Sequence, residues 1–301
     1  MGKNTVWLIG DKGMLGAELA PVLEGRGFPV VGTDREVDVT DAAALRGFAQ
    51  GKGFAWIVNC AAYTAVDKAE DDAQACRRLN TDGAGNIAAA AHAMGARLIH
   101  IATDYVFDGR GVVEPGAAAP RPYREDDATA PIGVYGATKR DGERAVAAVA
   151  PDSYIVRTAW LYGRHGNNFV RTMLRLMKER DAVSVVDDQR GSPTWAFDLA
   201  GAVAAFAAAA AAGRPAPYGI YHYTDEGAVT WFDFAREIHR QGRALGLLDK
   251  DCDVRPCTSA EFPAKVTRPA YSVLDKGKVK AALGLDIPDW RASLGRYLSQ
   301  G

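Results

Sequence analysis

Short apolar runs alternate along the first half of the chain with stretches whose apolar side chains recur every three or four positions. The runs are rich in β-branched and aromatic residues, which is typical of strands buried on both faces. They lie at residues 5–9, 30–34, 56–59, 98–101 and 154–156. The first intervening stretch places Leu15, Leu19 and Leu23 on one helical face. Because parallel strands need long crossovers, this rhythm predicts an α/β fold with a doubly wound parallel sheet.

The rhythm changes after residue 160. We predict a helix at 168–179, a short strand at 183–186 and a turn at 191–194. An alanine-rich helix near 200–213 and a strand at 220–223 continue the earlier pattern. The chain is therefore expected to form two units that are interleaved in sequence. The first takes residues 1–160 plus about 196–224, and a smaller C-terminal lobe takes 161–195 plus about 225–301.

Composition narrows the class of protein. The 36 Lys and Arg residues balance 37 Asp and Glu residues, which argues against a nucleic-acid binder. No apolar run has the length of a membrane span or the flanks of a signal peptide, so we expect a cytoplasmic protein that does not contact membranes. Cys252 and Cys257 have no second pair of ligands elsewhere, so no zinc site and no other metal ligands are predicted.

A glycine-rich turn follows the first predicted strand and opens the first predicted helix. Gly10, Gly13 and Gly16 are spaced so that the backbone can turn tightly and approach a pyrophosphate without an intervening Cβ. The helix that follows supplies unpaired N–H groups and a partial positive charge. The turn predicts a Rossmann-type dinucleotide-binding domain, with the lobe binding the substrate. The expected cofactor contacts in the turn are Gly10, Lys12, Gly13, Met14, Leu15 and Gly16.

The end of the second predicted strand bears on the choice of cofactor. Asp34 lies where a carboxylate would accept hydrogen bonds from the adenosine ribose hydroxyls, which favours NADH. Arg35 follows at once and could instead hold the 2′-phosphate of NADPH. The two residues favour opposite cofactors, so NADPH and NADH both remain open.

Three further residues have the chemistry of carbonyl reduction. Tyr135 and Lys139 are four positions apart, on one face of a predicted helix. We expect the ammonium group to lower the pKa of the phenol and to bind the nicotinamide ribose, which would make Tyr135 the proton donor. Thr103 follows the fourth predicted strand, where its hydroxyl could stabilise the developing oxyanion.

Together these motifs resemble those of the dTDP-4-dehydrorhamnose reductases, within the extended short-chain dehydrogenase/reductase family. The resemblance extends over nearly the whole chain. It rests on the segments at residues 10–16, 59–70, 102–109, 135–139, 157–163 and 188–194, and on Arg268, Pro269, Ser272 and Leu274.

The resemblance implies an oxidoreductase that uses NADPH or NADH to reduce the 4-keto group of a nucleotide-linked 6-deoxysugar, dTDP-4-dehydro-L-rhamnose, to dTDP-L-rhamnose. It implies Thr103, Tyr135 and Lys139 as catalytic residues. Further cofactor contacts are implied at Asp38, Val39, Ala61, Ala62, Tyr63 and Asn80. Substrate contacts are implied at Val66, Asp104, Tyr105 and Trp160.

Several alternatives stay open. Some relatives form a magnesium-bridged homodimer through glutamates, of which Glu18 matches one and the others have no assigned counterpart. Sugar-nucleotide dehydratases place a glutamate where this chain has Tyr105, whereas other epimerases and reductases use additional acid–base residues. The regulatory subunit of methionine adenosyltransferase shares many of the motifs without performing the reduction. The substrate's nucleobase and the product's stereochemistry are not determined by these residues.

Overall fold

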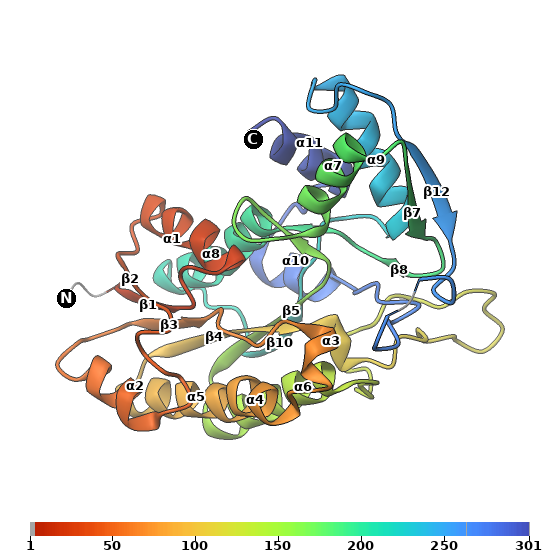
Figure 1. Ribbon diagram of the computed structural model, residues 1–301. Helices are drawn as coiled ribbons and strands as arrows, with labels where there is room; N and C mark the ends of the chain where they lie inside the picture. The colour runs from red at the N-terminus through yellow and green to blue at the C-terminus, as the bar shows by residue number, and fades with distance from the viewer. Residues whose placement is uncertain (1–3, 263, 301) are drawn as a thin grey trace.

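A six-stranded parallel sheet forms the centre of the protein, as the sequence predicted. The computed structural model describes residues 4–262 and 264–300. The strand order is β10-β5-β4-β3-β1-β2, and Figure 1 shows helices packed on both faces. The strands are β1 (Val6–Ile9), β2 (Val30–Thr33), β3 (Trp56–Asn59), β4 (Arg97–Thr103), β5 (Ser153–Thr158) and β10 (Gly219–His222).

Alternating side chains of the strands separate two hydrophobic clusters. In β1, Val6 and Leu8 pack into one cluster, whereas Trp7 and Ile9 pack into the other. The first face is covered by α1 (Met14–Gly25), α8 (Ala196–Ala211) and α10 (Gly277–Leu283). The opposite face carries α2 (Ala42–Ala49), α3 (Val66–Ala69), α4 (Ala73–Arg77), α5 (Gly83–Met94) and α6 (Val134–Val149), with a π-helical turn at Arg78–Asp82 and a 3₁₀ turn at Asp104–Val106.

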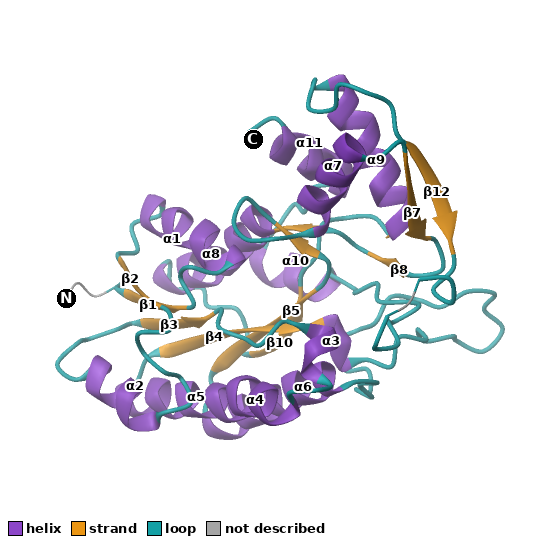
Figure 2. Cartoon of the chain, viewed as in Figure 1, coloured by secondary structure: helices purple, strands orange, loops and turns teal. Residues whose placement is uncertain are grey.

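A smaller lobe stands beside the sheet, at the upper right of Figure 2. Its helices are α7 (Phe169–Glu179), α9 (Trp231–Ala244) and α11 (Trp290–Leu298), and the first confirms the helix predicted at 168–179. Its short strands are β6 (Leu161–Tyr162), β7 (Ala182–Val186), β8 (Arg190–Gly191), β9 (Thr194–Trp195), β11 (Val229–Thr230) and β12 (Asp253–Cys257). Met177, Phe234 and Trp290 belong to a hydrophobic cluster of this lobe's own.

The division of the chain into two units stays a prediction, and the packing differs from it at one segment. Residues 225–301 were all assigned to the lobe. However, Val279 of α10 and Ile287 pack into the hydrophobic cluster on the face of the sheet that α1 and α8 cover. Lys278 also donates a 2.6 Å hydrogen bond to the Ile220 carbonyl of β10. The chain thus returns from the lobe to the sheet before it forms α11. The spacing of apolar residues along the sequence does not reveal this return.

The strand order places a crevice at one edge of the sheet. β1 pairs with β2 on one side and with β3 on the other, so the chain moves outward from β1 to β2 and then crosses back over β1 to β3. In open α/β sheets, ligands bind outside the carboxyl ends of strands at such a reversal. The crevice therefore lies beyond Ile9 and Asn59, the last residues of β1 and β3. Within the described ranges, no helix has the length and hydropathy needed to cross a membrane.

A buried ion pair joins α6 to β5. Arg157 donates to both carboxylate oxygens of Glu143 at 2.9 and 2.8 Å, and the two side chains are 2% and 5% exposed. The Arg157 guanidinium also lies 3.4 Å from the buried His222 ring, and burial lowers the pKa of that imidazole to about 3. The ion pair thus has little water around either charge.

Replacing one partner of this pair should destabilise the fold. Glu143→Gln leaves the Arg157 guanidinium buried without its counter-charge, so the free energy of unfolding should fall by about 3–5 kcal/mol in urea denaturation. Glu179→Gln is the control, because the Arg175–Glu179 pair is exposed and its loss should cost less than about 1 kcal/mol. Equal small losses in both variants would contradict this interpretation.

Candidate active site

The glycine turn brings main chain from β1, α1 and β3 into close approach. Gly10 has a φ of +81°, a conformation that favours glycine, and a Cβ there would lie 2.8 Å from the Ala61 amide nitrogen. A Cβ at Gly16 would lie 2.1 Å from the Gly10 carbonyl oxygen. Side chains at these two positions would therefore separate the first helix from the sheet.

The N-terminus of α1 fits an anionic ligand. Gly13 caps this fully described helix without a side-chain hydrogen bond, and the first turn of the helix has no acidic residue. Its first amides are thus not satisfied by a capping side chain, and the helix dipole adds positive potential. The pyrophosphate of a dinucleotide fits this cradle. Leu15 and Gly16 are buried, whereas Lys12 and Gly13 are exposed.

The segment after β3 is held by two asparagine side chains. Asn59 accepts a 3.0 Å hydrogen bond from the Ala61 amide. Asn80, in the π-helical turn, accepts from the Tyr63 amide at 2.8 Å and donates to the Tyr63 carbonyl at 3.1 Å. Because the Tyr63 main chain engages both polar atoms of Asn80, we interpret Asn80 as a residue that positions Ala61, Ala62 and Tyr63 at the crevice.

At the end of β2, Asp34 is half-buried and Arg35 is exposed. The sequence analysis did not single out Glu36, which accepts from the Asp34 amide at 2.9 Å and from Lys12 at 3.1 Å. An acid three residues after β2 was the only signal for it. Asp38 caps the next turn by accepting from the Thr40 amide, and Val39 is buried in the hydrophobic cluster against α5.

The three predicted catalytic residues meet at the carboxyl end of β4. Thr103 is its last residue and is 6% exposed. The Tyr135 phenol, which projects from the first turn of α6, lies close enough to Thr103 for the Thr103 hydroxyl to act on its pKa. Lys139, one turn further along α6, donates a 2.7 Å hydrogen bond to the Ile101 carbonyl of β4. The structure thus brings together residues that lie far apart in the sequence.

One electrostatic expectation is wrong. We expected Lys139 to lower the pKa of Tyr135, but burial raises the pKa of this phenol well above its usual value, and the nearby Thr103 hydroxyl offsets only part of the effect. Burial also lowers the pKa of Lys139 to about 8. Desolvation is the largest cause of both pKa shifts. The Lys139 ammonium group donates its hydrogen bond to the Ile101 carbonyl and not to the phenol.

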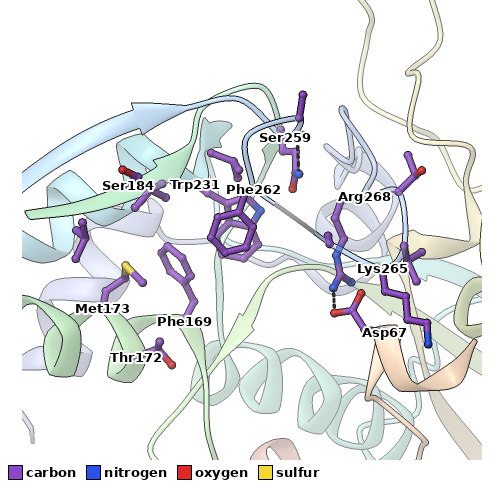
Figure 3. Close-up of a pocket in the computed structure, with 18 of the residues that line it drawn as sticks. Asp67, Phe169, Thr172, Met173, Ser184, Trp231, Ser259, Phe262, Lys265 and Arg268 are labelled. Atoms are coloured by element: carbon purple, nitrogen blue, oxygen red, sulfur yellow. Dashed lines mark hydrogen bonds and ion pairs between the residues drawn. The ribbon is translucent and has the colours of Figure 1, made fainter. Parts of the chain in front are cut away.

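A cavity of about 810 Å³ is lined mainly by residues of the lobe, and by Asp67 of α3 and Tyr105, which follows β4. Figure 3 shows an apolar end with Phe169, Met173 and Trp231, and a charged end where Arg268 contacts Asp67. Tyr105 also lines the cavity, and its ring meets the Tyr135 ring edge-on at a centroid distance of 5.4 Å.

Of the predicted substrate residues, Tyr105 lines the cavity, whereas Val66, Asp104 and Trp160 each adjoin a lining residue. Val66 begins α3, directly before Asp67, and Asp104 is 3% exposed beside Thr103. The Trp160 ring stacks on the Trp231 ring at 3.6 Å with an interplanar angle of 7°. Of this stacked pair, Trp231 lines the cavity. The sequence analysis missed Trp231. The only signal for it is an aromatic residue directly after Thr230, which caps α9.

Glu18 is buried in α1 and accepts a 3.1 Å hydrogen bond from the Arg164 amide, which links the sheet unit to the lobe. In the described part of the chain, no group of three or more His, Cys, Asp or Glu residues could hold a metal ion.

Comparisons with known proteins show the family of this chain. A family model described as the RmlD substrate binding domain matches residues 4–301. A dTDP-4-dehydrorhamnose reductase of Streptomyces griseus is 50% identical over 293 residues, which cover 96% of this chain and 91% of that protein. The crystal structure of the Clostridium acetobutylicum dTDP-4-dehydrorhamnose reductase has a TM-score of 0.88 and 40% identity, covering 98% of this chain and 99% of that one. The Bacillus anthracis dTDP-4-dehydrorhamnose reductase in complex with NADP has a TM-score of 0.90 and 35% identity, covering both chains completely.

The glycine turn can be tested by two substitutions in the same helix. Gly16→Ala should weaken NADPH binding by at least about tenfold (1.4 kcal/mol), because the added Cβ displaces the Gly10 carbonyl from its present position. Gly25→Ala should leave binding unchanged, since nothing lies within 4 Å of that added Cβ. NADPH fluorescence titration measures both affinities, and thermal melting checks the fold. Equal affinities in the two variants would remove the turn from the binding site.

Proposed function

This chain belongs to the dTDP-4-dehydrorhamnose reductase family, and we propose that it reduces the 4-keto group of dTDP-4-dehydro-L-rhamnose to give dTDP-L-rhamnose. It is an NAD(P)H-dependent oxidoreductase with a sugar nucleotide as its substrate. The observation that carries the proposal is the convergence of Thr103, Tyr135 and Lys139 at the carboxyl end of β4, beside the crevice at β1 and β3.

The protonation state of Tyr135 suits reduction. Because burial raises the pKa of the phenol, Tyr135 keeps its proton at neutral pH and can give it to the carbonyl oxygen of the substrate. Thr103 lies beside the phenol and stabilises the charge that develops on that oxygen. When bound, the nicotinamide supplies the hydride that reaches the carbonyl carbon.

The remaining residues bind and orient the two ligands. The glycine turn and the N-terminus of α1 would hold the pyrophosphate, while Ala61, Ala62 and Tyr63 would line the cofactor crevice under the control of Asn80. Lys139 would hold the nicotinamide ribose. In the cavity, Tyr105 stands next to Tyr135 and would contact the sugar, with Val66 and Trp160 supporting the pocket.

Two rival functions predict different measurements. A dehydratase of this fold would not consume NADPH in net turnover, and the Tyr105 position lacks the glutamate that such enzymes use. A regulatory subunit would bind NADPH without oxidising it. Loss of nicotinamide absorbance on adding a dTDP-4-keto-6-deoxysugar, with no loss in its absence, would distinguish the proposed reductase from both.

Removing the phenolic proton should affect chemistry rather than binding. Tyr135→Phe should lower kcat by about 10²–10⁴-fold, as for a lost general acid, with the Kd for NADPH nearly unchanged. Tyr218→Phe is the control, because Tyr218 is a surface residue whose hydroxyl accepts from Arg97 at the far end of β4. Full activity of Tyr135→Phe in steady-state assays would exclude Tyr135 as the proton donor.

The protein should use NADH and NADPH with similar efficiency. Asp34 supports NADH and Arg35 supports NADPH, so kcat/KM for the two cofactors should differ by less than about 10³-fold (roughly 4 kcal/mol). Arg35→Gln should lower kcat/KM for NADPH and leave that for NADH intact, whereas Asp34→Asn should lower kcat/KM for NADH. A change in the same direction for both cofactors in both variants would show that neither residue discriminates between them.

A further inference from the structure

Asp104 is a buried carboxylate adjoining the catalytic residues. The Thr103 hydroxyl donates a 3.0 Å hydrogen bond to Asp104 Oδ1 and accepts a 3.3 Å hydrogen bond from the Tyr105 amide. The Thr103 hydroxyl is also near enough to the Tyr135 phenol to lower its pKa. Thr103 therefore adjoins both Asp104 and Tyr135.

Within residues 4–262 and 264–300, no cationic side chain forms a hydrogen bond or ion pair with the Asp104 carboxyl. The groups that face its carboxyl are the Thr103 hydroxyl, the Ser272 hydroxyl and the phenols of Tyr105 and Tyr135. The nearby cations have other partners, since Arg268 reaches Asp67 and Tyr105, and Lys139 reaches the Ile101 carbonyl.

Burial accordingly raises the pKa of Asp104 to about 6, although the two hydroxyls offset part of the effect. The second carboxylate oxygen, Oδ2, is buried and forms no hydrogen bond within the described residues. The carboxyl group can therefore change protonation state in the range where such enzymes are assayed, without breaking an ion pair.

The Thr103 hydroxyl has a single proton, and two acceptors compete for it. While Asp104 is a carboxylate, it can only accept, so the Thr103 proton points to Oδ1 at an oxygen–oxygen distance of 3.0 Å and is withheld from the substrate oxygen. Once Asp104 is protonated, its own O–H can donate to Thr103 Oγ1. The Thr103 proton is then free to point at the carbonyl oxygen that Tyr135 protonates.

We propose that Asp104 is a positioning residue that determines whether the Thr103 hydroxyl donates to the reacting oxygen, an inference that rests on the proposed reductase function. No covalent bond changes at Asp104 or Thr103. The proton that reaches the product comes from Tyr135, and Thr103 contributes a second hydrogen bond to the developing oxyanion only when Asp104 is protonated.

The sign of the pH dependence follows from this arrangement. The more active form has protonated Asp104, so this part of the activity is present at low pH and is lost as pH rises through the pKa of Asp104, which is about 6 in the free protein. The decline should end in a plateau, since Tyr135 still donates. Losing one hydrogen bond to a charged oxygen should lower kcat/KM by about 10- to 100-fold.

The first experiment compares the pH profiles of kcat/KM for dTDP-4-dehydro-L-rhamnose in four proteins. The wild-type protein and Thr103→Ser should show the decline, because both have a hydroxyl at position 103. Asp104→Asn and Thr103→Val should lack it, and the double variant should resemble Thr103→Val alone. The same decline in Asp104→Asn, or additive losses in the double variant, would overturn the proposal.

A second measurement needs neither substrate nor activity. In protein with ¹³C-labelled aspartate carboxyl groups, the Asp104 resonance is identified by its absence in Asp104→Asn. Its pKa, read by NMR titration, should rise in Thr103→Val, since the donor that stabilises the carboxylate is lost. Ser272→Ala should also raise this pKa and move the kinetic decline to higher pH with it. An unchanged Asp104 pKa in Thr103→Val would overturn the proposal.

The two measurements separate the possible failures. If the wild-type protein does not oxidise NADPH with any dTDP-4-keto-6-deoxysugar, the proposed function fails, while the NMR titration still decides whether Thr103 donates to Asp104. If turnover is normal and the kinetic decline persists in Asp104→Asn, only the role of Asp104 fails. Thermal melting of Asp104→Asn and Thr103→Val shows whether a loss of folding accounts for either result.

Discussion

Gly10 has no room for a side chain, because the main chain of the segment after β3 lies against it. That close approach fixes where α1 begins relative to the sheet, and hence where the unpaired amides of the helix point. The same contact sets the register of the Ala61–Tyr63 segment, which Asn59 and Asn80 then hold from the other side. The cofactor crevice thus depends first on backbone packing and only afterwards on side-chain recognition.

Desolvation is the common electrostatic theme of the site. Burial favours the neutral phenol at Tyr135 and the neutral acid at Asp104, lowers the pKa of Lys139 and raises that of the Cys60 thiol to about 12. Each shift disfavours the charged form of its group. At neutral pH the Tyr135 phenol and the Cys60 thiol therefore keep their protons, whereas Asp104, whose pKa is about 6, is mostly a carboxylate.

Much of the fold could be predicted from the sequence, because buried parallel strands appear as short apolar runs and the glycine turn has a steric signature. The convergence of Thr103, Tyr135 and Lys139 was foreseen from strand ends and helical spacing. The direction of the Tyr135 pKa shift was not, since sequence spacing reveals a neighbouring cation but not the loss of water. The return of α10 to the sheet and the contact of Trp231 with the cavity depend on tertiary packing, which leaves no local pattern.

The stack of Trp160 on Trp231 connects the end of β5 to the first turn of α9. Trp160 has a φ of +47°, which is uncommon for a residue with a side chain, and its ring occupies the space that a Cβ at Gly191 would need, at 2.5 Å. These three positions therefore cannot vary independently in descendants of this protein. A smaller residue at 160 would open space at 191, and a larger residue at 191 would be tolerated only after that change. A change in the shape of the cavity wall at Trp231 should accordingly require substitutions at positions 160 and 191 as well, with the change at 160 before the change at 191.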